Sequence, residues 1–252
     1  MSQPPANEST DKVFTIADAI ARYESGEVSS QFRGIQSLVD QTIHHGAKDP
    51  IPNDSYLEAL FLTENMLRHA NHKINIVTGC ACDRFYSTLF THLAQAVQRI
   101  NSNGGTARIL IESNTCPKWM EALAIEYKNS FEVGFQPNGR LAHFIVCDSK
   151  IVRIEKPHGK LSLESAADEI KAEVFFNNPA EGSKLEKSFQ ELWDDVKINK
   201  PSGRTDIITA PSWLIHRTEA ARYLPRPTSE QVDSQMKAAA AIREASLSKL
   251  PA

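Results

Sequence analysis

The sequence contains little cysteine, with only four such residues in 252. Cys80 and Cys82 have one residue between them, whereas common zinc knuckles place about two to four residues between paired cysteines. Cys147 ends an apolar run and is expected to be a small core side chain. We therefore predict free thiols, no metal site and no cofactor.

The sequence also lacks long hydrophobic runs and an excess of positive charge. No stretch approaches the roughly 18 consecutive apolar residues that would span a membrane, and the first residues lack the basic and apolar regions of a secretion signal. The formal net charge is −3, so no overall positive field attracts nucleic acid or anionic lipid. These absences predict a soluble, cytoplasmic protein without a membrane partner.

What remains is the composition of a globular protein, in which 41% of residues are hydrophobic and 23% are charged. Residues 1–12 are polar and predicted to be disordered, residues 13–72 form a helical N-terminal segment, and residues 73–197 form an α/β domain. Residues 198–252 form a proline-rich arm with a C-terminal helix. Because the prolines of this arm cannot donate backbone hydrogen bonds, we expect the arm to be dispensable for folding.

Amphipathic spacing predicts three helices in the N-terminal segment. Apolar residues recur at helical spacing over residues 13–24 and 32–45. A third helix is predicted to begin after a cap at Asp54 or Ser55 and to run to about residue 71. The residues between the second and third helices, 48–53, include two prolines and are expected to be a linker.

A strand–helix rhythm characterises the α/β domain. The predicted strands cover residues 74–78, 107–111, 131–135, 141–147, 151–155 and 172–176. The predicted helices cover residues 83–100, a segment that opens at Pro117, and residues 179–197. This order predicts a mixed sheet flanked by helices.

The stretch Leu141–Glu155 predicts a β-hairpin with Asp148-Ser149-Lys150 as its turn. It resembles a strand of the phospholipase D (HKD) superfamily, in which His-x-Lys, an apolar run and an Asp precede a second strand. With the family's Asp aligned on Asp148, His143 takes the position of the Lys and Leu141 that of the nucleophilic His. The resemblance implies a phospholipase D-like α/β fold, to which this chain adds a helical N-terminal segment and an extended, partly helical C-terminal arm.

The resemblance also implies that the catalytic chemistry has been lost. In the family, the His attacks phosphorus and the Lys holds the phosphoryl oxygens. Leu141 can do neither, and His143 is not a dependable cation near neutral pH. The second His-x-Lys, His158-Gly159-Lys160, has Ser165 at the position of the Asp and no apolar strand, so it is expected to be a surface loop.

The leading functional hypothesis is a non-catalytic phospholipase D-like module that acts as a dimerising sensor or assembly subunit. A family active site uses two copies of the motif, so a single copy implies a homodimer. A module of this kind works beside another protein, and a bacterial defence or toxin system is a natural setting for it.

Two alternatives remain open. A residual phosphodiesterase or nuclease would use the weak catalytic candidates His143, Asp148, His158 and Lys160. A nucleic-acid-binding protein would use a degenerate HKD groove together with the basic and aromatic side chains of the arm. Those side chains are Trp213, Arg217, Arg222, Tyr223 and Arg226.

Overall fold

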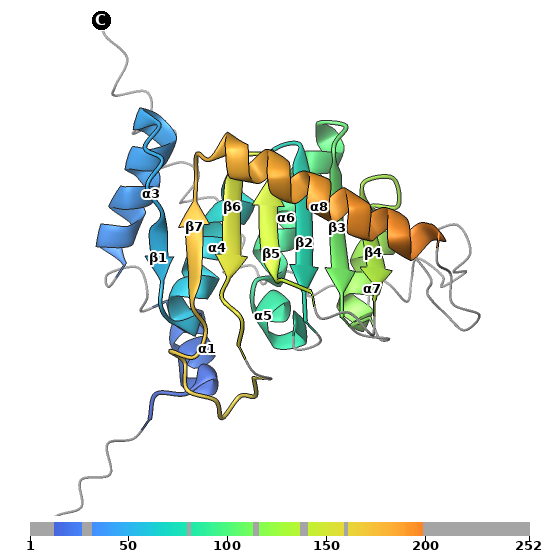
Figure 1. Ribbon diagram of the computed structural model, residues 1–252. Coiled ribbons are helices and arrows are strands. Elements are labelled where there is room, and N and C mark those ends of the chain that lie inside the picture. The colour runs from blue at the N-terminus through green and yellow to red at the C-terminus, as the bar shows by residue number, and fades with distance from the viewer. Residues whose placement is uncertain are drawn as a thin grey trace, which may run out of the picture. The chain divides into compact units, whose positions relative to one another are not determined.

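A seven-stranded mixed sheet forms the centre of the computed structural model (Figure 1). The structure describes residues 13–26, 32–79, 82–112, 116–136, 141–158 and 161–198. The strands are β1 (Ile51–Asn53), β2 (Lys73–Thr78), β3 (Thr106–Ile111), β4 (Phe131–Phe135), β5 (Phe144–Cys147), β6 (Ile151–Glu155) and β7 (Ala172–Phe175). They lie in the order β1-β7-β6-β5-β2-β3-β4.

The sheet has a parallel half and an antiparallel half that meet at β2. Strands β2, β3 and β4 are parallel, with Ile76 opposite Ile109 and Ile109 opposite Val133. Strand β5 pairs antiparallel with β2, and the antiparallel pairing continues through β6 and β7 to β1. The strand rhythm in the sequence had predicted this mixed sheet, and the prediction is confirmed.

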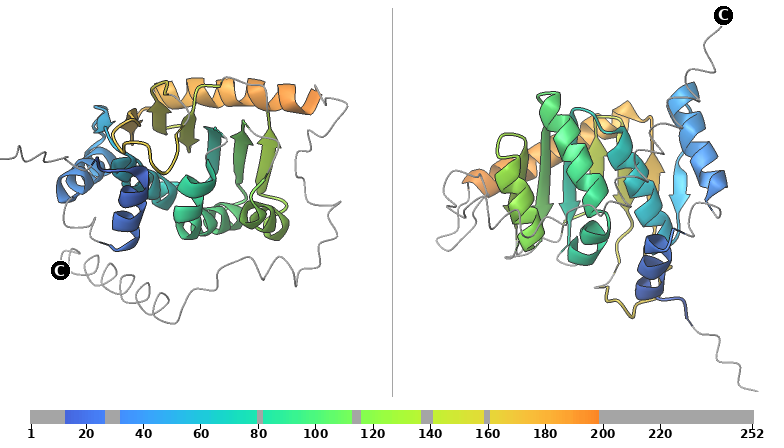
Figure 2. Two further views of the ribbon diagram at one scale, coloured as in Figure 1. Left: turned by 90° about the horizontal axis from the view of Figure 1, so that it is seen from below. Right: turned by 180° about the vertical axis from the view of Figure 1, so that it is seen from behind.

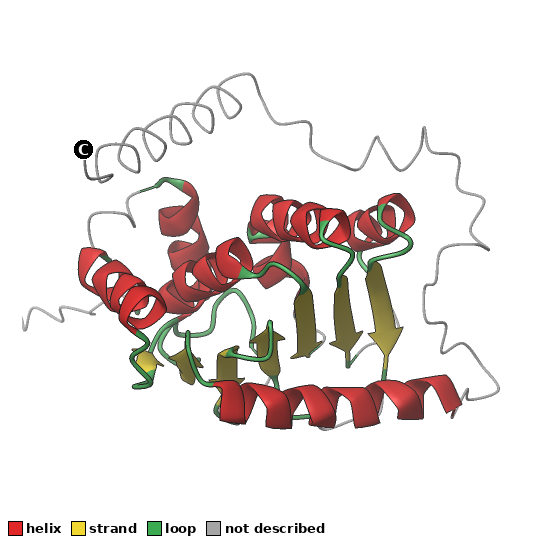
Figure 3. Ribbon diagram, turned by 90° about the horizontal axis from the view of Figure 1, so that it is seen from above, coloured by secondary structure: helices red, strands yellow, loops and turns green. Residues whose placement is uncertain are grey.

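Helices cover both faces of the sheet. They are α1 (Ile16–Glu24), α3 (Arg33–His45), α4 (Tyr56–His69), α5 (Cys82–Thr88), α6 (Phe90–Ser102), α7 (Lys118–Glu126) and α8 (Pro179–Ile198). Helix α8 lies across one face, whereas α4, α5, α6 and α7 lie on the other (Figures 2 and 3). Within the described residues, no helix is long and apolar enough to cross a membrane.

Each face of the sheet has its own apolar core. On the α8 face, Phe189 and Trp193 are buried and stacked, with ring centroids 5.4 Å apart, against Val77, Leu110 and Val146. The larger core on the opposite face extends from Ile16 and Ile20 of α1 to Phe176 after β7. The N-terminal helices therefore share one apolar core with the α/β part of the chain.

Several local signals in the sequence produced the expected structure. Ser55 caps α4 by accepting a hydrogen bond from the backbone N–H of Glu58, 3.2 Å away. The hairpin turn contains Asp148 and Ser149, which both have positive φ angles of 49° and 57°. The N–H of Lys150 donates to the carbonyl of Cys147 at 3.1 Å, so Asp148 and Ser149 are the central pair of a β-turn. Positive φ at both central residues is typical of type I′ turns, whose twist matches that of the adjoining strands.

Three local predictions were wrong. The predicted linker contains β1, which pairs with β7 at Ile51 and Val174, because proline is tolerated in an edge strand. The single helix predicted over residues 83–100 is two helices separated at Leu89, whose φ and ψ of −89° and 8° leave the helical region. The first hairpin strand begins at Phe144 and not at Leu141, since the preceding residues turn toward acidic side chains.

The outer segments, residues 1–12 and 199–252, lie outside the described residues. The predicted disordered N-terminus and docking arm therefore remain predictions, as do the domain boundaries assigned from the sequence.

Candidate functional site

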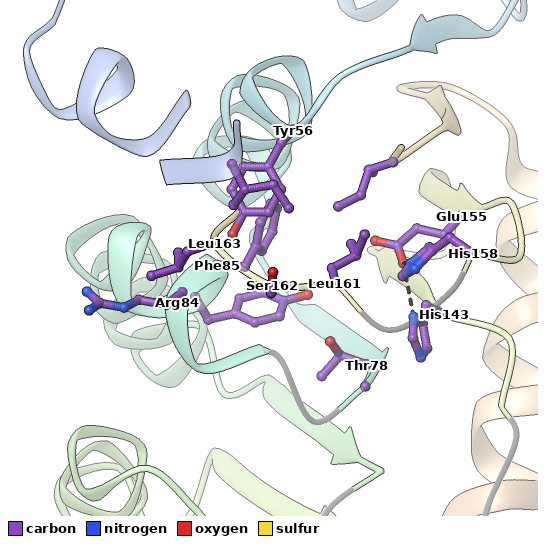
Figure 4. Close-up of a pocket in the computed structure, with 14 residues that line it drawn as sticks. Tyr56, Thr78, Arg84, Phe85, His143, Glu155, His158, Leu161, Ser162 and Leu163 are labelled. Atoms are coloured by element: carbon purple, nitrogen blue, oxygen red, sulfur yellow. Dashed lines mark hydrogen bonds and ion pairs between the residues drawn. The ribbon is translucent and has the colours of Figure 1, made fainter. Parts of the chain in front are cut away.

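A pocket of about 240 Å³ lies beyond the carboxyl end of β2 (Figure 4). Ligands of open α/β sheets commonly bind outside the carboxyl ends of the strands, where the order of the strands changes direction. Thr78 and Gly79, at the end of β2, line the pocket. Its lining is completed by Ile16, Tyr56, Arg84, Phe85, Tyr86, His143, Glu155, His158, Leu161, Ser162, Leu163 and Ile170.

The pocket has an aromatic and aliphatic side and a polar side. Figure 4 shows Tyr56, Phe85 and Leu163 on one side, and His143, Glu155 and His158 grouped on the other. Most of the accessible wall is apolar, with a few convergent polar groups, which is the usual composition of a small-molecule site.

The hairpin brings His143 and Glu155 together. His143 precedes β5 and Glu155 ends β6, and the backbone N–H of Glu155 donates a hydrogen bond to the carbonyl of His143 at 3.1 Å. The neighbouring pair Phe144 and Ile154 is in antiparallel register. His158, three residues after Glu155, returns to the same carboxylate.

Glu155 is the centre of the polar cluster. Its Oε2 atom lies 3.1 Å from Nδ1 of His143 and 3.3 Å from Nε2 of His158. Nε2 of His143 lies 3.5 Å from Oε2 of Glu112, which follows β3. The two imidazole rings meet edge to face, with centroids 5.7 Å apart and planes at 62°.

A buried guanidinium holds the other oxygen of Glu155. Nη1 of Arg153 pairs with Oε1 of Glu155, and Nε of Arg153 donates to Oδ1 of Asn53 at 3.1 Å. Arg153 is 2% exposed and lies 5.9 Å from the centre of the Phe85 ring, within cation–π range. Glu155 therefore has a fixed position and a nearby compensating charge.

The electrostatics of the cluster favour the ionised forms of its members. Burial alone would raise the pKa of Glu155, but the charge of Arg153 and hydrogen bonds from His143, His158 and Arg153 hold this pKa well below its usual range. The hydrogen bond with Glu155 raises the pKa of His143 against the opposing effect of burial, and Glu112 adds to the rise. His143 is thus stabilised as a cation between two carboxylates.

The structure brings together only some of the predicted site residues. His143 and His158 share the pocket, which the sequence did not indicate. Asp148 lies in the turn at the other end of β5, where its carboxylate accepts backbone hydrogen bonds. Leu141 packs with the apolar cluster on the α8 face. Lys160 and the arm residues lie outside the described residues, so their roles remain predictions.

Sequence reasoning missed the acidic residues and Arg153. Glu112 follows β3 and Glu155 is the last residue of β6, and charged residues at the ends of apolar strands were the available signal. Arg153 lies in the middle of an apolar strand and was a second signal, because a buried charge requires a partner.

The similar solved structures include a phospholipase D family member. This member, Nuc from Salmonella typhimurium, matches with a TM-score of 0.42 and 16% identity over 58% of this chain and 95% of that chain. NucT from Helicobacter pylori matches with a TM-score of 0.34 and 18% identity over 55% and 87%.

A third similar structure is TrmBL2, an archaeal chromatin protein described as having a novel mode of DNA binding. It has a TM-score of 0.45 and 16% identity over 69% of this chain, and the match spans 64% of TrmBL2. At these identities the likeness concerns the fold alone. No protein-family model matches the chain, and no curated protein matches it.

Proposed function

We propose that this protein is a non-catalytic phospholipase D-like module, which binds a small ligand in the pocket and acts as a dimerising sensor or assembly subunit. One observation carries the non-catalytic part of the proposal: both ring nitrogens of His143 face carboxylates, at 3.1 Å from Glu155 and 3.5 Å from Glu112. An imidazole that attacks phosphorus needs a ring nitrogen with a free lone pair directed at the substrate.

The charges around His143 also oppose phosphodiester chemistry. Glu112 and Glu155 would repel a phosphate group, whose developing negative charge needs positive groups or hydrogen-bond donors. Arg153 is the nearest buried cation, but it is already paired with Glu155. Leu141, at the position of the family's nucleophile, has an apolar side chain that packs with the cluster on the α8 face.

The pocket itself supports ligand binding. At about 240 Å³ it is slightly smaller than typical drug-sized sites of about 300–1,000 Å³. Its groups come from several separate parts of the fold, α1, α4, β2, α5 and the β5–β6 hairpin. A ligand held there would contact all of them and could alter how they pack, which is the property that a sensor requires.

An assay of phosphodiester hydrolysis tests the absence of catalysis. The purified full chain should not hydrolyse bis-p-nitrophenyl phosphate or DNA above the level of a blank. Turnover that is lost in His143→Ala and kept in His72→Ala, a histidine exposed at the other end of β2, would overturn the proposal.

Light scattering tests the dimer. The expected mass at micromolar concentration is about twice the 28.0 kDa of one chain. A mass near 28.0 kDa over this range would contradict a dimerising module.

A further inference from the structure

We propose that His143, Glu155 and His158 bind a divalent transition-metal ion of the zinc class, one per chain, in the wall of the pocket. This inference rests on the proposed binding function, because it names the ligand of the same pocket. The sequence had predicted no metal site, because the Cys80–Cys82 spacing does not match a zinc knuckle and no local pattern indicated which histidines lie close together.

The spacing of the three donor atoms fits a metal ion. One atom from each residue can be chosen so that all three lie within 4.8 Å of one another. Oε2 of Glu155 lies 3.1 Å from Nδ1 of His143 and 3.3 Å from Nε2 of His158. Tetrahedral bonds of about 2.0–2.2 Å place neighbouring donor atoms about 3.4 Å apart. Small side-chain movements would therefore admit an ion, and its binding would release the proton that Nδ1 of His143 directs at Glu155 in the metal-free protein.

The donor types select the class of ion. Two imidazoles and one carboxylate suit zinc and neighbouring transition metals, whereas magnesium and calcium prefer oxygen donors alone. Three protein ligands leave a fourth position for water or a second ligand. Because all three residues line the pocket, that position would be supplied from the pocket.

In His143 and Glu155, the donor atom that does not face the ion is held by a neighbour. Nε2 of His143 lies 3.5 Å from Glu112, which can orient the ring by accepting its N–H. Oε1 of Glu155 is paired with Arg153, so only Oε2 is left for the metal. Such supporting contacts to ligand histidines and carboxylates are typical of protein metal sites.

Gly79 makes space for the His143 ring. A Cβ atom at position 79 would lie 2.9 Å from Cε1 of His143, which is too close, and 3.2 Å from its Nε2, which is tight, so the ring would have to shift. Because Gly79 has no side chain, the His143 ring can lie close to the end of β2. Gly79→Ala should displace the ring and weaken metal binding.

Calorimetric titration with zinc chloride tests the site. The full chain is purified without a polyhistidine tag and treated with EDTA before titration. We expect one ion per chain in the wild type and at least a tenfold loss of affinity in His143→Ala, Glu155→Gln and His158→Ala. Glu112→Gln should weaken binding by about 10- to 100-fold, because it removes an orienting contact.

Two control variants separate this site from other histidines and from the thiols. His72→Ala and the double variant Cys80→Ser, Cys82→Ser should bind zinc like the wild type. The inference is overturned if the wild type shows no saturable binding, if Glu155→Gln retains full affinity, or if the cysteine variant loses it.

Cobalt substitution tests the site in the wild-type chain, so its result does not depend on whether a variant folds. Bound Co²⁺ should give a visible spectrum of nitrogen and oxygen ligands without a thiolate charge-transfer band. A thiolate band would assign the ion to cysteines and overturn the inference.

The zinc-loaded protein should also be assayed for phosphodiester hydrolysis. Hydrolysis that depends on bound zinc would overturn the non-catalytic function and leave the metal site intact. An inactive dimer that fails to bind zinc would overturn the metal site alone.

Discussion

Oδ1 of Asp148 accepts a hydrogen bond from the backbone N–H of Lys73 at 2.7 Å, across 75 residues of sequence. The same carboxylate accepts from the N–H groups of Asn71 and His72, each at 2.8 Å. These hydrogen bonds connect the start of β2 to the hairpin turn. The Asp that the sequence aligned with the phospholipase D motif therefore has a structural role here, away from the pocket.

Replacement of Asp148 by Asn should destabilise the fold. Asn tolerates the positive φ of this position almost as well as Asp, so the change isolates the loss of charge and of one acceptor oxygen. We expect the free energy of unfolding in urea to fall by about 1–3 kcal/mol. Asp195→Asn, at an exposed position of α8, should change it by less than about 0.5 kcal/mol. Equal values for the two variants would contradict the structural role.

Gly182 allows α8 to lie directly on the hairpin turn. A Cβ atom there would lie 2.1 Å from the carbonyl oxygen of Ser149, and this neighbour is backbone that cannot rotate away. Gly182→Ala should therefore lower the free energy of unfolding by about 1–3 kcal/mol or more.

The matched control is Gly34→Ala in α3, where no atom lies within 4 Å of the added carbon. Alanine favours helices over glycine by about 0.5–1 kcal/mol, so this variant should be as stable as the wild type or more stable. If the two variants changed the melting temperature by the same amount, the steric clash at Gly182 would be contradicted.

His92 should make the protein sensitive to mild acid. Burial lowers the pKa of His92, with an opposing effect of Glu64 and a smaller lowering by Arg68. The folded state therefore takes up a proton on His92 at a lower pH than the unfolded chain, in which histidine titrates near pH 6.5. Protonation favours the unfolded state, so this contribution to stability is present above that pH and is lost as the pH falls through it.

His92→Gln should remove that part of the acid sensitivity. Urea denaturation at pH 7.5 and 5.5 should show a smaller loss of stability in the variant than in the wild type. An identical loss in both proteins would show that His92 contributes nothing. Nδ1 of His92 is buried without a hydrogen-bond partner among the described residues, and Nε2 lies 3.6 Å from Oε1 of Glu64, a contact that the amide of Gln can keep as a donor.

Cys147 should resist alkylation while the protein is folded. The side chain is fully buried in β5, and burial raises the pKa of its thiol. Since the thiolate is the reactive form, iodoacetamide at pH 8 should modify Cys116, which is partly exposed, at least tenfold faster. Peptide mapping by mass spectrometry measures both rates. Rapid modification of Cys147 without denaturant would mean that β5 is accessible.

Local signals in the sequence were sufficient for most elements. Strand β4 has the predicted bounds, Phe131–Phe135, because Phe131, Val133 and Phe135 alternate along it as strand-forming side chains and a turn precedes it. Pro179 begins α8 as expected, and Asn178 caps it by accepting from the backbone N–H of Glu181. In each case, residues within a few positions determine the structure.

The site depended on contacts that local patterns do not encode. Glu112 and His143 are 31 residues apart and meet only because β2 lies between β3 and β5. His158 was interpreted as part of a surface loop, since nothing nearby indicated that its ring returns to Glu155. Strand order and register bring these groups together, and a single sequence does not specify either.

Pro52 has a consequence for how two copies of this protein can associate. It occupies the middle of β1, the outermost strand on one side of the sheet, and α3 stands beside that strand (Figure 1). An unprotected outer strand is a template on which a second molecule can continue the sheet and, in the worst case, aggregate. Pro52 has no N–H to offer and the strand is three residues long, so this margin is a poor template. The proposed homodimer should therefore join through side chains, without a sheet that runs from one subunit into the other at β1.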